Sequence, residues 1–356
     1  MDMRRIPVQV QNGYDVCIGR GLIANFGELL SRAVGSCRVA VITDSNVAPL
    51  YLDALTQSLD DAGYDVCAFA FPAGEGSKQM GTLAEILEFL VENRLTREDC
   101  VIALGGGVTG DLTGFAAGCY LRGIRYVQAP TSLLAAVDSS VGGKAAVDLS
   151  AGKNLAGLFY QPSLVICDTN CFATLPEREI ANGSAEAIKT GVLGGETLFG
   201  LFESGSAREQ IEQVVSQCVA YKARIVEADE RDSELRNILN LGHTAGHAIE
   251  VCSGYAIPHG EAVAIGLNII ARASERLGEA EEPIAGRIRQ TLVKNGLPVV
   301  SPYSAEDLAA AALSDKKRTG DSIRLVLPRS IGNCVLKSIP VGELLTIFRA
   351  GMEEDA

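Results

Sequence analysis

Several sequence features are missing from this chain of 356 residues, and each absence excludes a class of protein. No run of 18 or more apolar residues occurs, so a membrane-spanning helix is excluded. Residues 1–8 lack the apolar stretch of a secretory signal, and we therefore expect a cytoplasmic protein. The ten cysteines form no CxxC pair and are expected to be buried, reduced thiols. With 47% hydrophobic and 21% charged residues, the remaining composition is that of a globular protein.

Positive charge is also scarce, and the net charge is −13. An acidic protein of this kind is not expected to bind nucleic acid or an anionic membrane. The basic residues nevertheless gather near the glycine-rich and histidine motifs described below. These residues are Arg122, Arg125, Lys144, Lys153, Lys189, Lys222, Arg236, Lys316 and Lys317. A basic pocket within an acidic protein indicates a small anionic ligand, although any one of these lysines taken alone is more simply a solvated surface charge.

Short apolar strands alternate with amphipathic helices through the first half of the chain. Alternating residues around Asn12-Gly13 predict a β-hairpin over 5–20. Further strands are predicted at 37–43, 65–71, 100–104, 126–129 and 164–167, with helices near 50–62 and 81–93. This alternation is typical of a mainly parallel α/β sheet.

After about Pro176 the pattern becomes helical. Helices are predicted over 177–203, 206–228, 237–252, 260–277, 282–295 and 305–313, with one hairpin over 322–337. We therefore expect an α/β domain over 1–176 and an all-α, or mainly α-helical, C-terminal domain over 177–356, with the active site in the interdomain cleft. The segment 133–157 is rich in glycine, serine and lysine, and it is predicted to be a long functional loop.

A glycine-rich motif, Gly105-Gly-Gly-Val-Thr-Gly-Asp111, follows one of these strands and opens a helix that runs to Cys119. Glycines there let the backbone approach a phosphate, to which the helix N-terminus offers its N–H groups. Two strand–helix units precede the motif and no acidic residue follows at the ribose-binding distance, so a standard Rossmann unit is disfavoured. A non-standard dinucleotide site is favoured over a simple tight turn. Asp44 could hold an adenosine ribose, or it could be a helix N-cap.

The only three histidines, His243, His247 and His259, fall within 17 positions. His243 and His247 are i, i+4 neighbours and share a face if their segment is helical. Thr244 and Ala245 replace the central residues of an HExxH motif, which disfavours a zincin-type protease. The cluster predicts a metal site, and the alternative is three ordinary core histidines.

Such a site needs at least one more protein ligand and leaves a position for substrate or water. Composition does not choose among three carboxylates, Glu186, Glu250 and Glu261. Zn²⁺, Co²⁺ and Fe²⁺ all suit a set of histidine and carboxylate ligands.

Eight sequence blocks in order resemble the 3-dehydroquinate synthase family over nearly the whole chain. The blocks are Gly105-Gly-Gly-Val-Thr-Gly-Asp111, Tyr120-Leu-Arg-Gly123, Pro130-Thr-Ser-Leu-Leu134, Val137-Asp-Ser-Ser-Val-Gly-Gly-Lys144, Gly152-Lys-Asn-Leu155, Ala185-Glu-Ala-Ile-Lys189, Asn240-Leu-Gly-His-Thr-Ala-Gly-His-Ala-Ile-Glu250 and His259-Gly-Glu-Ala-Val263. The resemblance implies a Zn²⁺ or Co²⁺ ion held by Glu186, His243 and His259, with His247 as a substrate contact.

The resemblance also implies NAD⁺ binding in the first domain and substrate binding in the second. The implied NAD⁺ contacts are Asp44, Glu75, Lys78, Gly105, Gly106, Gly107, Val108, Asp111, Thr131, Ser132, Asp138, Ser139, Lys144 and Lys153. The implied contacts to substrate hydroxyls and carboxylate are Asp138, Lys189, Lys222 and Asn240. The implied phosphate contacts are Lys144, Asn154, Arg236 and one of Lys316 or Lys317. Arg122 matches an arginine that reaches the neighbouring subunit's active site, so a homodimer is expected.

The implied substrate is 3-deoxy-D-arabino-heptulosonate 7-phosphate, which agrees with the basic pocket. The implied reaction is redox-neutral: NAD⁺ is reduced and reoxidised within one turnover, phosphate leaves by β-elimination, and an aldol step closes the carbocycle. Two positions depart from the family pattern, Ala145 where threonine is usual and Asp232 where glutamate is common.

Three alternatives share parts of this pattern. Another sugar-phosphate cyclase, such as a 2-epi-5-epi-valiolone or 2-deoxy-scyllo-inosose synthase, is expected to depart from the segment 138–144 that this chain retains. A glycerol-dehydrogenase-like metal alcohol dehydrogenase would release NADH. A non-catalytic NAD-binding or scaffold protein would tolerate loss of the ligands and lysines.

Overall fold

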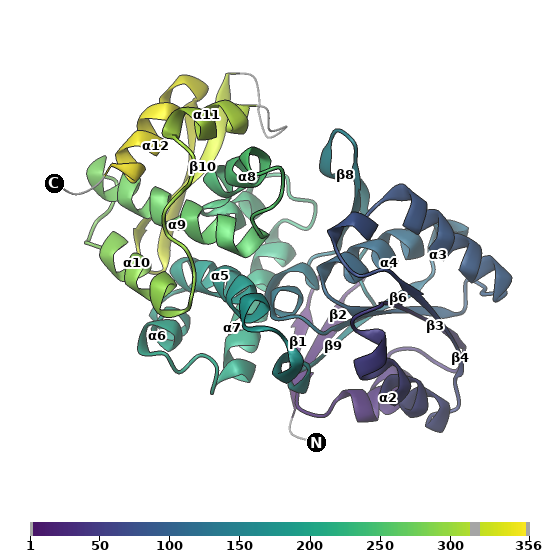
Figure 1. Ribbon diagram of the computed structural model, residues 1–356. Coiled ribbons are helices and arrows are strands. Elements are labelled where there is room, and N and C mark those ends of the chain that lie inside the picture. Colours follow the sequence, from purple (N-terminus) through teal and green to yellow (C-terminus); the bar gives the residue numbers. More distant parts are fainter. Residues whose placement is uncertain (1–2, 314–320, 354–356) are drawn as a thin grey trace. The chain divides into compact units, whose positions relative to one another are not determined.

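The computed structural model describes residues 3–313 and 321–353 (Figure 1). The chain forms two compact units, one of residues up to Leu175 together with Lys222–Arg231, the other of Pro176–Tyr221 together with the residues from Asp232 onward. The predicted phosphate contacts Lys316 and Lys317 lie outside the described residues.

A seven-stranded sheet in the order β1-β2-β9-β6-β5-β3-β4 organises the first unit. Its strands are β1 (Met3–Val8), β2 (Tyr14–Gly19), β3 (Arg38–Asp44), β4 (Asp65–Phe71), β5 (Cys100–Gly105), β6 (Arg125–Pro130) and β9 (Leu164–Asp168). Only the β1–β2 pair is antiparallel, and every other neighbouring pair is parallel. The predictions of a hairpin followed by a mainly parallel sheet are therefore confirmed.

Helices pack on both faces of this sheet because its strands are apolar on both sides. Alternate residues of β3, Ala40 and Ile42, join the core beneath α3 (Met80–Glu92) and α4 (Gly107–Cys119). The intervening Val39 and Val41 are equally buried and point to the opposite face. Figure 1 shows α2 (Ala48–Asp61) on that opposite side, where it packs against α1 (Phe26–Ser31).

The segment 133–157 is more ordered than the predicted loop. It begins with a short π-helix over Ala135–Ser139 and continues into a hairpin of β7 (Lys144–Leu149) and β8 (Gly152–Phe159). The hairpin forms its own two-stranded sheet, and β7 packs against α4. Glycine and serine are used here for turns and close packing, and the prediction of a continuous loop is wrong.

The second unit is mainly helical with one hairpin, as predicted. Its elements are α5 (Glu177–Gly194), α6 (Glu196–Ser204), a 3₁₀ helix η6 (Leu235–Asn240), α8 (His243–Cys252), α9 (His259–Arg276), α10 (Ala285–Lys294), α11 (Ala305–Leu313), β10 (Ser322–Ser330), β11 (Asn333–Pro340) and α12 (Leu344–Met352). α7 (Ile211–Ala228) contributes residues to both units. Gly195, with φ of 116°, divides the helix predicted over 177–203. Among the described residues, no helix meets the length and apolarity that a membrane span requires.

Helices α8 and α9 cross with their backbones nearly touching. A Cβ placed on Gly266 would lie 2.1 Å from the carbonyl oxygen of Gly242 and 2.8 Å from the amide nitrogen of Gly246. Gly242, with φ of 77°, also supplies the left-handed turn from which α8 begins at His243. The glycines therefore hold the beginning of α8 against α9.

Replacing Gly266 by alanine is expected to destabilise the protein by roughly 2–3 kcal/mol, because the added methyl group must push two main chains apart. The free energy of unfolding in urea measures this loss. Gly286→Ala in α10 is the matched control, since a Cβ there meets nothing within 4 Å. The control should change stability by less than about 1 kcal/mol, in the stabilising direction. Equal stability of both variants would contradict the tight crossing.

Candidate functional site

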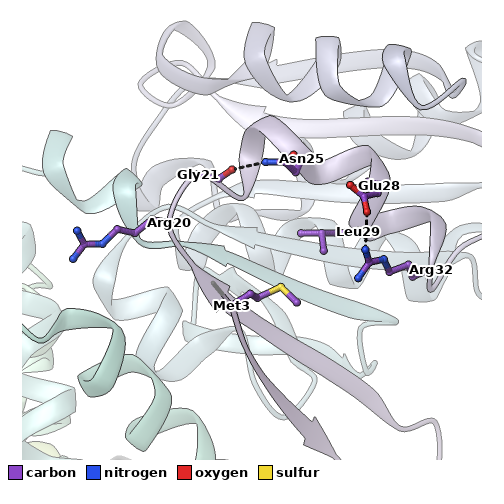
Figure 2. Close-up of a pocket in the computed structure, with 7 residues that line it drawn as sticks. All are labelled: Met3, Arg20, Gly21, Asn25, Glu28, Leu29 and Arg32. Carbon is purple, nitrogen blue, oxygen red and sulfur yellow. Dashed lines mark hydrogen bonds and ion pairs between the residues drawn. The ribbon is translucent and has the colours of Figure 1, made fainter. Parts of the chain in front are cut away.

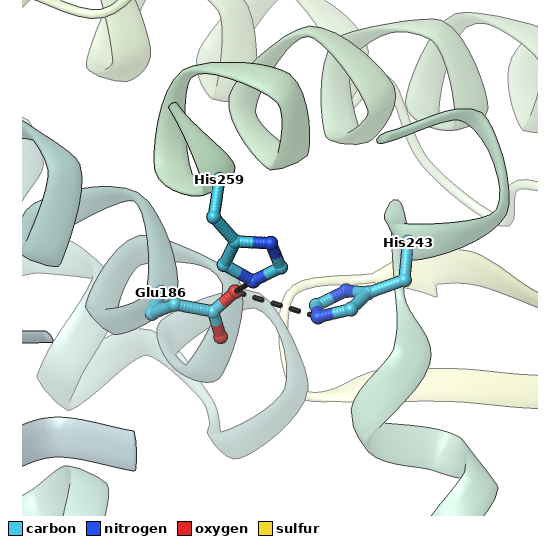
Figure 3. Close-up of side chains that lie close together, drawn as sticks. All are labelled: Glu186, His243 and His259. Carbon is cyan, nitrogen blue, oxygen red and sulfur yellow. Dashed lines mark ion pairs between the residues drawn. The ribbon is translucent and has the colours of Figure 1, made fainter. Parts of the chain in front are cut away.

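Three residues predicted as metal ligands, Glu186, His243 and His259, come together in the second unit (Figure 3). They arise from α5 and from the first residues of α8 and α9. The Nε2 atoms of His243 and His259 lie 3.5 Å and 3.3 Å from the same oxygen, Oε1 of Glu186. One ligand atom from each residue falls within 4.8 Å of the others. This spacing suits one bound divalent cation.

The second ring nitrogen of each histidine has its own partner, which directs Nε2 toward Glu186. His243 Nδ1 lies 3.1 Å from the carbonyl oxygen of Leu241, an acceptor that requires a proton on Nδ1. His259 Nδ1 lies 3.4 Å from Oε2 of the buried Glu250. Metal-binding histidines are typically oriented in this way by a carbonyl or carboxylate.

These contacts distinguish the three candidate carboxylates. Glu186 faces the Nε2 atoms, whereas Glu250 faces the opposite side of the His259 ring. Glu261 forms an ion pair with Arg178, with 2.7 Å between its Oε1 and the arginine Nε. The geometry therefore fits Glu186 as the carboxylate ligand and Glu250 as the group that orients His259.

The electrostatics of the cluster are those of a site built for a cation. Burial would raise the pKa of the Glu186 carboxyl, but the Lys189 ammonium and His259 lower that pKa to about 2. Burial would lower the pKa of His259, but the Glu186 and Glu250 carboxylates raise that pKa to about 10. Lys189 and His259 both approach Glu186, yet neither of its buried oxygens has a hydrogen bond of good geometry among the described residues. A divalent cation held by Glu186, His243 and His259 would supply positive charge to this buried carboxylate in place of the proton on His259.

His247 lies beside this cluster without joining it. Its ring centroid is 5.3 Å from that of His243 and 6.1 Å from that of His259. His247 belongs to a second set of possible ligand atoms, which it forms with Glu250 and His259. The group of Glu186, His243 and His259 does not include His247. The assignment of His247 to the substrate stays a prediction.

The glycine motif of the first unit forms the predicted turn from β5 into α4. A Cβ on Gly106 would lie 3.3 Å from Oγ of Ser132, and one on Gly107 would lie 3.2 Å from Oγ of Ser139. The amide of Thr131 donates to the carbonyl of Gly105 at 2.9 Å. Gly106 and Gly107 thus leave a narrow cradle beside the two serine hydroxyls, which side chains larger than glycine would fill.

Asp44 combines structural contacts with a position near this cradle. Its Oδ1 accepts hydrogen bonds from the amides of Asn46 and Val47, at 2.9 Å and 3.1 Å, just before α2. Its Oδ2 accepts one from the hydroxyl of Thr109 at 3.3 Å. Asp44 is therefore not the N-cap of α2, which is Val47. Its Oδ1 stabilises the turn between β3 and α2, while its Oδ2 links the end of β3 to the glycine motif. Val108, a residue of α4, is partly buried and packs against the core of the first unit.

Lys78 is buried, and its ammonium lies 2.6 Å from Oδ2 of Asp111 and 2.6 Å from Oδ1 of Asn154. Burial would lower the pKa of Lys78, but Asp111 outweighs it and the pKa is raised. Lys153 Nζ lies 3.4 Å from Oε1 of Glu75. The residues predicted to contact cofactor and phosphate are thus linked to one another.

The other predicted substrate residues are distributed over both units. In the first unit, Lys222 Nζ donates to both the carbonyl and the Oδ1 of Asp138, each at 2.7 Å. Lys144 and Arg122 are exposed, and Arg122 has a left-handed φ of 67°. In the second unit, Lys189 lies buried beside Glu186, Arg236 is buried in η6, and Asn240 ends that helix.

The two departures from the family pattern have local explanations. Ala145 is buried on β7 beside α4, where a Cβ built on Gly114 would already lie 3.1 Å from its methyl group, so a small residue fits. Asp232 has a left-handed φ of 57°, a conformation that aspartate adopts more readily than most residues.

A hollow of about 740 Å³ in the first unit contains none of the predicted site residues (Figure 2). It is lined by Met3, Arg20, Gly21, Asn25, Glu28, Leu29 and Arg32. Arg32 is 2.6 Å from Glu28 within it. Its volume alone does not make it a candidate site.

Two supporting groups escaped the sequence-based predictions. The Leu241 carbonyl carries no sequence signal, because any residue has a carbonyl. Asp148, whose Oδ1 accepts from the amide of Asn154 at 2.8 Å, lies in the segment predicted as a loop. A sequence-based prediction of the β7–β8 hairpin would have placed Asp148 near Asn154.

Comparisons with known proteins cover nearly the whole chain. A family model described as 3-dehydroquinate synthase N-terminal matches residues 68–182, and one described as 3-dehydroquinate synthase C-terminal matches 183–318. A 3-dehydroquinate synthase of Pelobacter propionicus is 44% identical, over 96% of this chain and 97% of its own length. One of Vibrio atlanticus is 43% identical, over 95% and 96%.

Solved structures of related cyclases share the fold. A 2-deoxy-scyllo-inosose synthase complexed with carbaglucose-6-phosphate, NAD⁺ and Co²⁺ is 25% identical, with a TM-score of 0.87 over 98% of this chain and 99% of that chain. A 2-epi-5-epi-valiolone synthase from Streptomyces hygroscopicus subsp. jinggangensis, with NAD⁺ and Zn²⁺ bound, is 28% identical at the same TM-score and coverage. An iron-containing alcohol dehydrogenase, 15% identical over 99% of each chain with a TM-score of 0.66, shares the fold alone.

Proposed function

Because this chain belongs to the 3-dehydroquinate synthase family, we propose that it converts 3-deoxy-D-arabino-heptulosonate 7-phosphate to 3-dehydroquinate and inorganic phosphate. The observation that carries the proposal is the cluster of the buried Glu186 and His243 with the partly buried His259, in a chain 44% identical to a synthase of this name. Identity to the other two cyclases is only 25% and 28%, which favours this substrate over theirs.

The cofactors follow from the donor groups present. Glu186, His243 and His259 would hold Zn²⁺ or Co²⁺, and the cradle around Gly106 and Gly107 would hold the diphosphate of NAD⁺. When bound, the metal supplies Lewis-acid polarisation of substrate hydroxyls and NAD⁺ supplies a hydride acceptor.

The chain's own residues supply charge and orientation. Lys189, buried beside Glu186, would attract an anionic group of the substrate to the metal ligands. Lys222 is already held by Asp138, so its ammonium is oriented before substrate binds. Lys144, Asn154 and Arg236 would bind the phosphate. Holding one flexible substrate in a single conformation would supply much of the rate.

We also propose a homodimer in which Arg122 completes the partner's active site. Arg122 is exposed and lies in a turn whose residues Leu121 and Arg122 both have left-handed φ angles, 50° and 67°. Such strained turns usually persist where they place a functional side chain.

Purified protein supplied with NAD⁺ and Zn²⁺ or Co²⁺ is expected to release inorganic phosphate from the heptulosonate phosphate without net NADH formation. Phosphate is measured by a coupled colour assay and NADH by its absorbance. Accumulating NADH would instead identify a metal alcohol dehydrogenase. No phosphate release from metal-replete protein would refute the proposed function.

A further inference from the structure

Lys78 holds two chain segments together from a buried position. Its side chain is only 8% exposed, and it contacts Asp111 on α4 and Asn154 on the β7–β8 hairpin, both at 2.6 Å. Asp111 is the last residue of the glycine motif. One ammonium group therefore joins the helix that begins at the cofactor cradle to a residue predicted to bind phosphate.

The contact fixes the orientation of the Asn154 amide. An ammonium group has only donors, so it must face Oδ1 of Asn154. The two hydrogens on Nδ2 then point away from Lys78, and the exposed position of Asn154 leaves them available to a ligand. An outward-facing NH₂ group suits an anion, whereas a flipped amide would present its oxygen and repel one.

The main chain around this contact is ordered as well. The amide of Asp148 donates to the carbonyl of Lys78 at 2.8 Å, and the amide of Asn154 donates to Oδ1 of Asp148 at 2.8 Å. Asn154 itself has a left-handed φ of 53°. These bonds hold the tip of the hairpin next to Lys78 in one conformation.

We propose that Lys78 is a positioning residue that orients the Asn154 amide toward the substrate phosphate and ties this orientation to the helix bearing the glycine motif. The proposal rests on the proposed function for the identity of the anion. It gives Lys78 a role toward the substrate in addition to the cofactor contact implied by the family resemblance.

A double-mutant cycle tests the proposal. Lys78→Met and Asn154→Ala, each at saturating NAD⁺ and metal, are expected to raise KM for the heptulosonate phosphate on the order of tenfold. Because both changes remove the same oriented amide, the KM of the double variant should also rise about tenfold and not a hundredfold. Independent effects that multiply to about a hundredfold would overturn the proposal.

Lys153→Met is the matched control, since Lys153 adjoins Asn154 on the hairpin while its ammonium faces Glu75. Its effect on KM should multiply with that of Asn154→Ala to within about twofold. If Lys153→Met and Lys78→Met were equally non-additive with Asn154→Ala, the coupling would be explained by general damage to the hairpin. That result would overturn the proposal.

Asn154→Asp provides a test that keeps a partner for Lys78 and does not depend on the folding of a lysine variant. The melting temperature should stay near the wild-type value, while KM rises at least as much as for Asn154→Ala, because the donors are replaced by a negative charge. Wild-type KM in this variant would refute the role of the oriented amide.

The same cycle can be measured without turnover through the Kd for inorganic phosphate in the presence of NAD⁺. Non-additive losses of phosphate affinity in a protein that does not turn over the heptulosonate phosphate would refute the proposed function and support the role of Lys78. Additive losses of phosphate affinity in a protein that does turn over the heptulosonate phosphate would support the proposed function and refute the role of Lys78.

Discussion

Replacing His259 by alanine is expected to weaken metal binding on the order of a thousandfold, whereas His247→Ala should retain the metal and lose turnover. His259 presents Nε2 to Glu186 at 3.3 Å and Nδ1 to Glu250 at 3.4 Å, so its removal takes away one of the three proposed ligands. His247 lies outside the Glu186 cluster. Metal content after dialysis and kcat of the metal-loaded proteins separate the two roles.

Glu261→Gln is the matched control for this pair. Glu261 lies two residues from His259, but its carboxylate is engaged by Arg178 and not by the histidines. This variant should keep its metal, and Glu250→Gln should lose about tenfold to a hundredfold in metal affinity because His259 loses its orienting carboxylate. Equal metal loss from the His247 and His259 variants would contradict the assigned ligand set.

Binding of Zn²⁺ is expected to release close to one proton per site at neutral pH. The folded-state pKa of His259 without metal is raised to about 10, above its ordinary value of 6.5, so this histidine is protonated at neutral pH. A metal ion binds only the neutral imidazole and must displace that proton. The apparent metal affinity should therefore rise about tenfold per pH unit and level off as the pH passes about 10. Glu186 adds no slope in this range, because its pKa of about 2 leaves it ionised.

Calorimetric titration in buffers of different ionisation enthalpy measures the released proton directly. Glu250→Gln removes one of the two carboxylates that raise the pKa of His259, so its proton release should decline at a lower pH than in the wild type. Metal binding with no proton release near neutral pH would show that His259 is neutral before the metal arrives.

Much of the fold could be predicted because it depends on local patterns. The buried runs of β3 and β5 and the Asn12-Gly13 turn carry strong strand and hairpin signals, and the structure has all three. The β7–β8 hairpin and the break at Gly195 were not predicted. Both depend on tertiary contacts and on glycine conformations that the composition of a segment does not reveal.

The candidate site was predictable to the level of residue type. The three histidines within 17 positions indicated a metal, but their spacing could not decide which pair would share the ion. His243 and His247 share a face of α8, yet the histidine that lies with His243 against Glu186 is His259 of α9. The roles of Glu250 and of the Leu241 carbonyl required coordinates, because both act through the far side of an imidazole ring.

The glycine crossing of α8 and α9 restricts how the metal preference of this protein could change during evolution. Since no methyl group fits at Gly266, the separation between the beginning of α8 and the middle of α9 is set by main-chain contact, which substitution cannot adjust gradually. A shift toward a larger or smaller ion would have to arise from exchangeable side chains around the ligands, with Glu250 the first position at which to look for it.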